Sequence, residues 1–104
     1  MIRQFDVIAN PDPLDAHDRP FVVVLQSDLV SDLRSTVVAP LVPRESMRGA
    51  QRLNPLLKLD GSEYWLAIHE LFAVERRILL RQAGNVSDQR DAIIAALDLL
   101  FTGI

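Results

Sequence analysis

Three stretches in the first half of the chain carry apolar patterns that predict β-strands. Residues 20–26 contain five consecutive apolar side chains, three of them valine, which is typical of a strand covered on both faces. Residues 2–8 alternate imperfectly but are rich in types that suit a pleated backbone. Residues 35–42 form a third β-rich segment, in which Pro40 predicts a bulge or an edge position because proline has no N–H to donate.

The end of the chain predicts an amphipathic helix. One apolar stripe at helical spacing is formed by Ile93, Leu97, Leu100, Phe101 and Ile104. Ser87 or Asp88 is expected to cap the first turn. Because the stripe continues to the last residue, the apolar terminus must dock on the protein's own sheet or meet a partner.

The middle of the chain predicts a hairpin and then an ambiguous segment. Asp60-Gly61 separates two apolar stretches, which is a strong hairpin pattern. From Trp65 to Arg81 the local propensity and the spacing of Ile68 and Leu71 favour a helix. Residues 76–81 could equally form a strand.

Polar stretches interrupt these elements. Residues 10–18 hold two prolines and several acids and amides, which predicts an exposed loop. Leu29, Val30 and Leu33 lie on a turn rich in Ser and Asp, and they are expected to fold under the loop as a small apolar cluster.

Three arginines, Arg44, Arg48 and Arg52, recur at intervals of four residues. They would align on one face if residues 43–54 were helical. Such a face would be either simply solvated or a docking site for an acidic peptide.

Composition narrows the class of protein. The 104 residues suit one domain, residues 1–104, and the chain has no cysteine and a formal net charge of −3. This excludes disulfides and thiolate chemistry, and it argues against a general binder of nucleic-acid backbone. No apolar run reaches the length of a membrane span and no secretory leader is recognisable, so a cytoplasmic protein is expected.

Catalytic and metal-binding patterns are weak. The two histidines, His17 and His69, have no second ligand at metal spacing, and there is no glycine-rich phosphate loop. Neither a metal nor a cofactor is therefore expected. Asp28, Asp32 and Glu45 could approach one another in space, but the residues favour a binding module over an enzyme.

Several segments, taken together, resemble the CcdB family of toxin–antitoxin toxins. The resemblance depends on their order and spacing from about Phe21 onward, and it ends at the terminal Gly-Ile. The segments are Phe21-Val22-Val23-Val24-Leu25-Gln26-Ser27-Asp28-Leu29-Val30, Val37-Val38-Ala39-Pro40-Leu41, Leu53-Asn54-Pro55-Leu56-Leu57-Lys58-Leu59 and residues 92–104.

The resemblance implies an α+β fold of SH3-like barrel type, with a five-stranded antiparallel sheet, a small side sheet and a C-terminal helix. It implies a strand from Val74 to Arg81 in place of the helix that local propensity favours. It also implies a symmetric homodimer that binds the A subunit of DNA gyrase, traps the gyrase–DNA cleavage complex without touching DNA itself, and is neutralised by a CcdA-type antitoxin.

Matching by position implies a gyrase-binding set: Leu29, Val30, Asp98, Thr102, Gly103 and Ile104. The resemblance therefore implies that Leu29 and Val30 are surface contacts and do not belong to the hydrophobic core. Thr102 stands where the best-known member has tryptophan, and Asp98 stands where it has an amide. The antitoxin-binding residues are expected to be Arg44, Arg48 and Arg52.

Two alternatives remain open. A homologue could keep the fold, the dimer and antitoxin binding without poisoning gyrase, and Thr102 gives this alternative its basis. An endoribonuclease toxin could share the same barrel, although the acidic net charge and the weak catalytic patterns argue against it.

Overall fold

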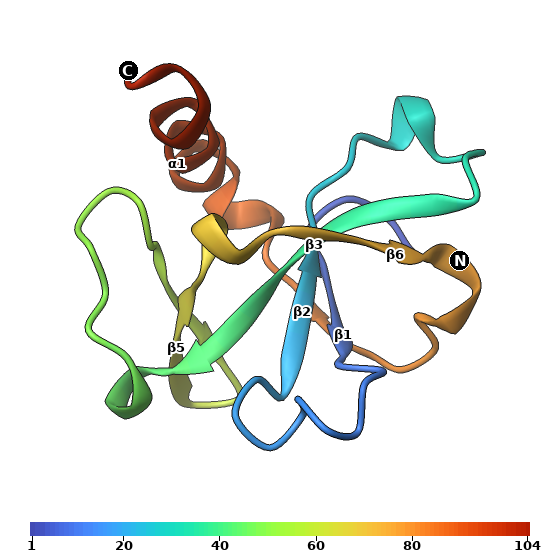
Figure 1. Ribbon diagram of the computed structural model, residues 1–104, viewed down its shortest axis with the longest axis horizontal. Coiled ribbons are helices and arrows are strands. Elements are labelled where there is room, and N and C mark those ends of the chain that lie inside the picture. Colours follow the sequence, from blue (N-terminus) through green and yellow to red (C-terminus); the bar gives the residue numbers. More distant parts are fainter.

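The computed structural model describes all 104 residues and contains seven strands, five short 3₁₀ turns and one α-helix, joined by irregular loops (Figure 1). The strands are β1 (Asp6–Ala9), β2 (Phe21–Val24), β3 (Ser35–Pro43), β4 (Leu56–Leu59), β5 (Ser62–Leu66), β6 (Phe72–Glu75) and β7 (Gln82–Asn85). The helix is α1 (Arg90–Thr102), and the 3₁₀ turns are η1 (Asp28–Val30), η2 (Arg44–Ser46), η3 (Ile68–Glu70), η4 (Arg76–Ile78) and η5 (Ser87–Gln89).

All strand pairs are antiparallel, and β3 joins two parts of one curled sheet. Its first half pairs with β6 and its second half with β5, while β2 pairs with the other edge over the central residues 38–41. Five strands therefore run in the order β6-β3-β2-β1-β7, and the β4–β5 hairpin forms a side sheet against the end of β3. With the C-terminal helix, this confirms the α+β, SH3-like barrel class.

Pro40 lies where β3 changes partners. It is buried, and it pairs with Val22 of β2 on one side only, because the pairing with β6 ends at Val38 and the pairing with β5 begins at Leu41. The predicted edge position is therefore confirmed locally, at a break in the ladder, although β3 as a whole has neighbours on both sides. The Pro40 carbonyl accepts a hydrogen bond from the N–H of Ala67 at 2.9 Å, on the side where the pairing with β6 has ended and the pairing with β5 begins. The missing proline N–H therefore falls at a gap in the ladder, where it interrupts neither pairing.

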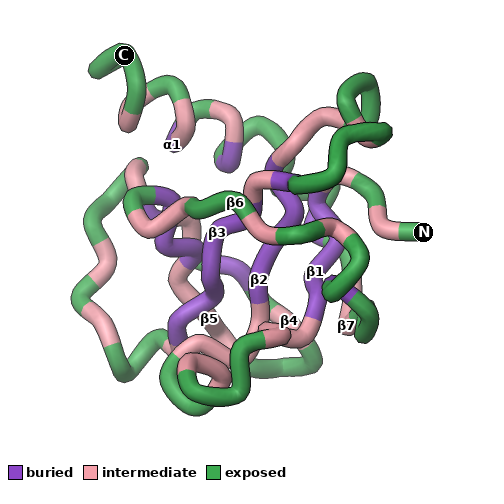
Figure 2. Tube along the Cα trace, turned by 45° about the vertical axis from the view of Figure 1, so that its right-hand side comes forward, coloured by how far each residue is buried: buried purple, intermediate pink, exposed green.

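The sheet is buried on both faces, as the valine-rich run predicts. One face of β2 and its neighbours packs in a cluster of 12 buried residues that includes Ile93 and Ala96 of α1. The other face packs in a smaller cluster of five buried residues, in which Leu79 packs with side chains from β1, β2 and β3. Figure 2 shows the buried positions concentrated in β1, β2 and β3, whereas Phe101 and Thr102 at the end of α1 are exposed.

The predicted helix between residues 65 and 81 is wrong, because η3, β6 and η4 occupy this segment. The strand implied for 74–81 is confirmed only as far as Glu75, and the next strand begins at Gln82. Pairing of β6 with β3 supplies the backbone hydrogen bonds that a helix would otherwise have made locally, so tertiary pairing overrides local propensity.

The two ends of the chain also depart from expectation. The first strand begins at Asp6, not at residue 2, because residues 3–6 form a turn in which Phe5 has a φ of 69°. The buried Asp6 carboxylate accepts hydrogen bonds from the side chains of Gln82 and Asn85, both at 2.9 Å. The predicted helix is confirmed at residues 90–102, but neither Ser87 nor Asp88 caps it, since both lie within η5.

Candidate functional site

The C-terminal tail is ordered by hydrogen bonds and leaves its apolar side chains exposed. The Thr102 hydroxyl donates to the Asp98 carbonyl at 2.6 Å, and Gly103, with a φ of 76°, donates its N–H to the Leu99 carbonyl at 3.0 Å. This left-handed cap favours glycine because a Cβ would be strained there. Phe101 and Ile104 are 68% and 82% exposed, so the end of the apolar stripe does not dock on the protein's own sheet.

The η1 turn presents a second exposed apolar group. Leu29 is 94% exposed, although its N–H is fixed by the Ser27 hydroxyl. The Gln26 side chain donates to the Val30 carbonyl at 2.9 Å, which holds the turn in shape. The prediction that Leu29, Val30 and Leu33 fold under the loop is wrong. Their exposure agrees with the surface position that the family resemblance implies.

Within one chain the structure does not bring the two halves of the predicted gyrase-binding set together. Figure 1 places η1 at the upper right and the end of α1 at the upper left. Leu29 and Val30 therefore lie apart from Asp98 and the 102–104 tail. A single contact surface containing both groups would require a second copy of the chain or a partner that spans the upper edge of the molecule.

The helical alignment predicted for the three arginines is wrong. Only residues 44–46 form a 3₁₀ turn, and residues 47–55 are irregular. Arg44 pairs with Glu63 at 2.6 Å, Arg48 is exposed, and Arg52 donates to the carbonyl of Ile104 at 3.3 Å. The last contact joins one predicted antitoxin-binding residue to the predicted gyrase-binding tail.

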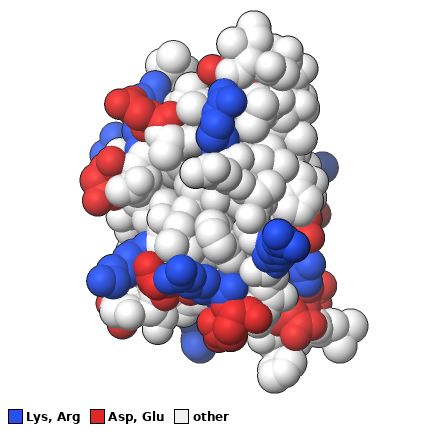
Figure 3. Space-filling model, turned by 90° about the vertical axis from the view of Figure 1, so that its left-hand side faces the viewer, with Lys and Arg blue, Asp and Glu red and all other residues white.

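Sequence reasoning missed a groove between the 49–56 loop and α1. It has a volume of about 460 Å³, and its walls include Trp65, Leu56, Ala92 and Ala95. A Cβ on Gly49 would lie 2.4 Å from the Trp65 ring, so the loop reaches the indole only because residue 49 is glycine. The two small alanines, three residues apart on α1, were the pattern that could have indicated an open helix face. Figure 3 shows a mainly uncharged surface on this side of the molecule, with charged side chains around it.

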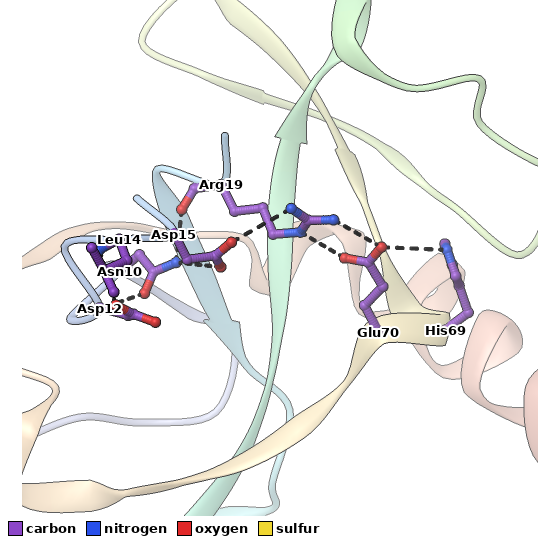
Figure 4. Close-up of polar contacts among 7 residues, drawn as sticks. All are labelled: Asn10, Asp12, Leu14, Asp15, Arg19, His69 and Glu70. Carbon is purple, nitrogen blue, oxygen red and sulfur yellow. Dashed lines mark hydrogen bonds and ion pairs between the residues drawn. The ribbon is translucent and has the colours of Figure 1, made fainter. Parts of the chain in front are cut away.

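A polar network ties the 10–19 loop to the barrel (Figure 4). Arg19 donates to both oxygens of Glu70, at 2.7 and 3.0 Å. This bidentate hydrogen bonding lowers the pKa of Glu70, because it favours the ionised carboxylate over the neutral acid. His69 accepts at Nδ1 from the Asn54 amide at 3.2 Å when its proton is on Nε2.

The structure also bears on the other sequence-predicted features. No group of three or more His, Asp or Glu side chains is placed to hold a metal ion. The Asp28 carboxylate accepts the N–H of Gln4 at 2.9 Å and pairs with Arg3 at 3.7 Å. No helix has the length and apolar character needed to cross a membrane. What the surface offers is ordered, exposed apolar groups on η1 and at the end of α1.

Comparison with known families confirms the resemblance seen in the sequence. The family model for the CcdB protein matches residues 4–103, a range that contains the whole sheet, η1 and α1. Comparison with curated proteins gave no match.

Proposed function

The chain belongs to the CcdB family, and from this membership we propose that it binds the A subunit of DNA gyrase and traps the cleaved gyrase–DNA complex. Membership supports a toxin of a toxin–antitoxin system, and the chain itself carries out no catalytic step in this proposal. The toxin acts by conformational trapping: it binds the cleaved state of gyrase more tightly than the resting state and so shifts the population towards it.

The observation that carries the proposal is the exposure of ordered apolar side chains at the positions that the family resemblance assigns to gyrase. Leu29 and Ile104 are 94% and 82% exposed on backbone that hydrogen bonds hold in place. Ordered apolar groups lose little conformational entropy on binding, so their burial contributes favourably to association. Asp98, Thr102 and Gly103 complete the set on the same turn of α1 and its cap.

A homodimer would account for the separation of η1 from the tail. Most homo-oligomers are two-fold symmetric, so each copy presents the same surface to the other. Two copies related in this way place two tails and two η1 turns around one axis, and a partner at the axis could contact all four. A CcdA-type antitoxin neutralises the toxin by covering part of this assembly.

The experiment measures cleaved plasmid DNA formed by purified gyrase and ATP in the presence of the protein. We expect Leu29→Ser to reduce cleavage at least about tenfold, since removing a buried leucine from a contact costs about 1.5–3 kcal/mol. Leu14→Ser is the matched control because Leu14 is 92% exposed in the 10–19 loop, and it should give as much cleaved DNA as the unmodified protein does. Absence of cleavage with the unmodified protein would favour the homologue that binds antitoxin but does not poison gyrase, and equal effects of the two substitutions would remove η1 from the gyrase contact.

A further inference from the structure

An arginine-rich pocket lies beside the N-terminal segment, on the opposite side of the molecule from the groove at Trp65. Its volume is about 450 Å³. Four apolar residues and three arginines line it: Met1, Ile2, Leu33, Leu79, Arg34, Arg76 and Arg77. We name the cavity formed by these residues the arginine pocket. The backbone segments that carry these residues, η4, the loop after η1 and the N-terminus, lie at the right-hand side of Figure 1.

The end of the β3–β6 ladder brings the three arginines together. The N–H of Arg76 donates to the carbonyl of Arg34 at 3.0 Å, directly beyond the last strand pair. Arg77 follows in η4. The Arg76 guanidinium donates to the carbonyl of Ile2 at 3.0 Å, which holds the N-terminal segment against the pocket. The cluster is therefore fixed by backbone pairing and does not depend on flexible side chains meeting by chance.

The charge of this cluster is largely uncompensated. Neither Arg34 nor Arg76 makes an ion pair, and Asp32, the nearest acid in sequence to Arg34, makes none either. Arg77 pairs with Glu75 at 2.6 Å, but its side chain is 80% exposed, so water and salt screen that pair and a competing carboxylate can replace it. In a chain of net charge −3, this concentration of positive charge attracts an anionic partner.

The apolar part of the lining decides what kind of anion fits. Four of the seven lining residues are hydrophobic, and Leu33 is 54% exposed. A nucleic-acid backbone is recognised by basic and polar groups and gains little from apolar walls. A peptide with carboxylates next to an apolar side chain matches both features, because the apolar side chain can enter the pocket while its acidic neighbours meet Arg34 and Arg77 at the rim.

We propose that the arginine pocket binds an acidic peptide segment that inserts an apolar side chain, and that this segment belongs to the antitoxin. The assignment to the antitoxin rests on the proposed function, whereas the peptide chemistry rests on the pocket alone. This site differs from the Arg44, Arg48 and Arg52 set, which the structure does not gather on one face.

The test is binding of the synthetic peptide acetyl-(Glu-Leu)₄-amide to the isotope-labelled full chain, followed by methyl and amide chemical shifts. The expected result is saturable shifts at Ile2, Leu33 and Leu79, with binding weakened at least about tenfold in R34E/R77E. The matched control is R44E/R48E, which makes the same charge change and also reverses one arginine paired at 2.6 Å and one unpaired arginine. R44E/R48E should alter the affinity for the peptide by less than about twofold, because neither residue lines the arginine pocket and salt screens charges that do not touch the peptide.

Several outcomes would overturn the proposal. The first is no binding of acetyl-(Glu-Leu)₄-amide at millimolar concentration, and the second is a loss of affinity in R44E/R48E that equals or exceeds the loss in R34E/R77E. The others are that acetyl-(Glu-Ser)₄-amide binds as tightly as the leucine peptide, or that a 12-base-pair DNA duplex binds more tightly than it. If R34E/R77E melts much below the unmodified protein, Leu33→Ser is used in its place. Leu33 is exposed, so its replacement removes an apolar contact to the peptide without removing a side chain from the core. Unchanged affinity of Leu33→Ser for the peptide also counts against the pocket. Gyrase cleavage is measured without peptide, so failure of the pocket and failure of the gyrase proposal remain distinguishable.

Discussion

Deleting Gly103 and Ile104 separates a binding role of the tail from a structural one. The structure gives these residues two hydrogen bonds to the rest of the chain, from the Gly103 N–H to Leu99 at 3.0 Å and from Arg52 to Ile104 at 3.3 Å. Each is solvent-accessible and stabilises the fold by about 0.5 kcal/mol, so the deletion should cost about 1 kcal/mol in the free energy of unfolding. For a domain of this size, that loss lowers the melting temperature by about 4–8 °C.

The expected effect on binding is larger. Ile104 is 82% exposed, so nearly all of the free energy of burying an isoleucine, about 2 kcal/mol, is available to a partner. Its loss corresponds to about 30-fold in the dissociation constant. Thr102→Trp is the converse change. It gives up one exposed hydroxyl contact and adds a large aromatic surface, so we expect it to tighten binding about tenfold or more.

The assay is calorimetric titration of each variant with the purified A subunit of gyrase, combined with thermal melting of the same samples. Truncation that leaves the affinity unchanged would refute the assignment of the tail to gyrase. A fall in melting temperature beyond about 15 °C would show that the tail is part of the folded core or of the dimer, and the reasoning from exposure would then be wrong.

Three further predictions concern the groove, the polar network and the assembly. Gly49→Ala should cost about 1–3 kcal/mol and shift the emission of Trp65, the single tryptophan, because the new Cβ lies 2.4 Å from the indole. Gly61→Ala is strained by its φ of 82° but its Cβ meets no neighbour, so it should lower stability without shifting the emission, and equal emission in both variants would contradict the contact at Gly49. Glu70→Gln should cost under about 1 kcal/mol in urea unfolding at pH 7. Because the Glu70 pKa is lowered in the folded state, the cost should be full above about pH 4.3 and should shrink as the pH falls through the lowered pKa, and a cost that does not depend on pH would speak against the pairing with Arg19. Sedimentation at micromolar concentration should give twice 11.7 kDa, and a clean monomer would remove the dimer on which the shared gyrase surface depends.

The sequence alone determined those elements whose cause is local. Asp60-Gly61 forms the two-residue turn between β4 and β5 because both residues adopt positive φ, 50° and 82°, which this pair tolerates. The valine run forms β2, and the apolar stripe forms α1. In each case the determining chemistry lies within a few residues of the element itself. The family resemblance adds the barrel class, which the strand order confirms.

Only the tertiary structure decided the features that depend on distant partners. Residues 72–75 form a strand because β3 offers them an open edge, and nothing in their own propensity reveals that edge. The regular spacing of Arg44, Arg48 and Arg52 predicts a helix face, yet the loop is held by distant contacts, such as the one between the Gly49 backbone and Trp65. Arg34 and Arg76, in contrast, are 42 positions apart in the sequence, and the backbone hydrogen bond between them places them in one pocket. Periodicity reports neighbours along the chain, whereas a curled sheet places residues according to strand pairing, and pairing is fixed only when the whole core is buried.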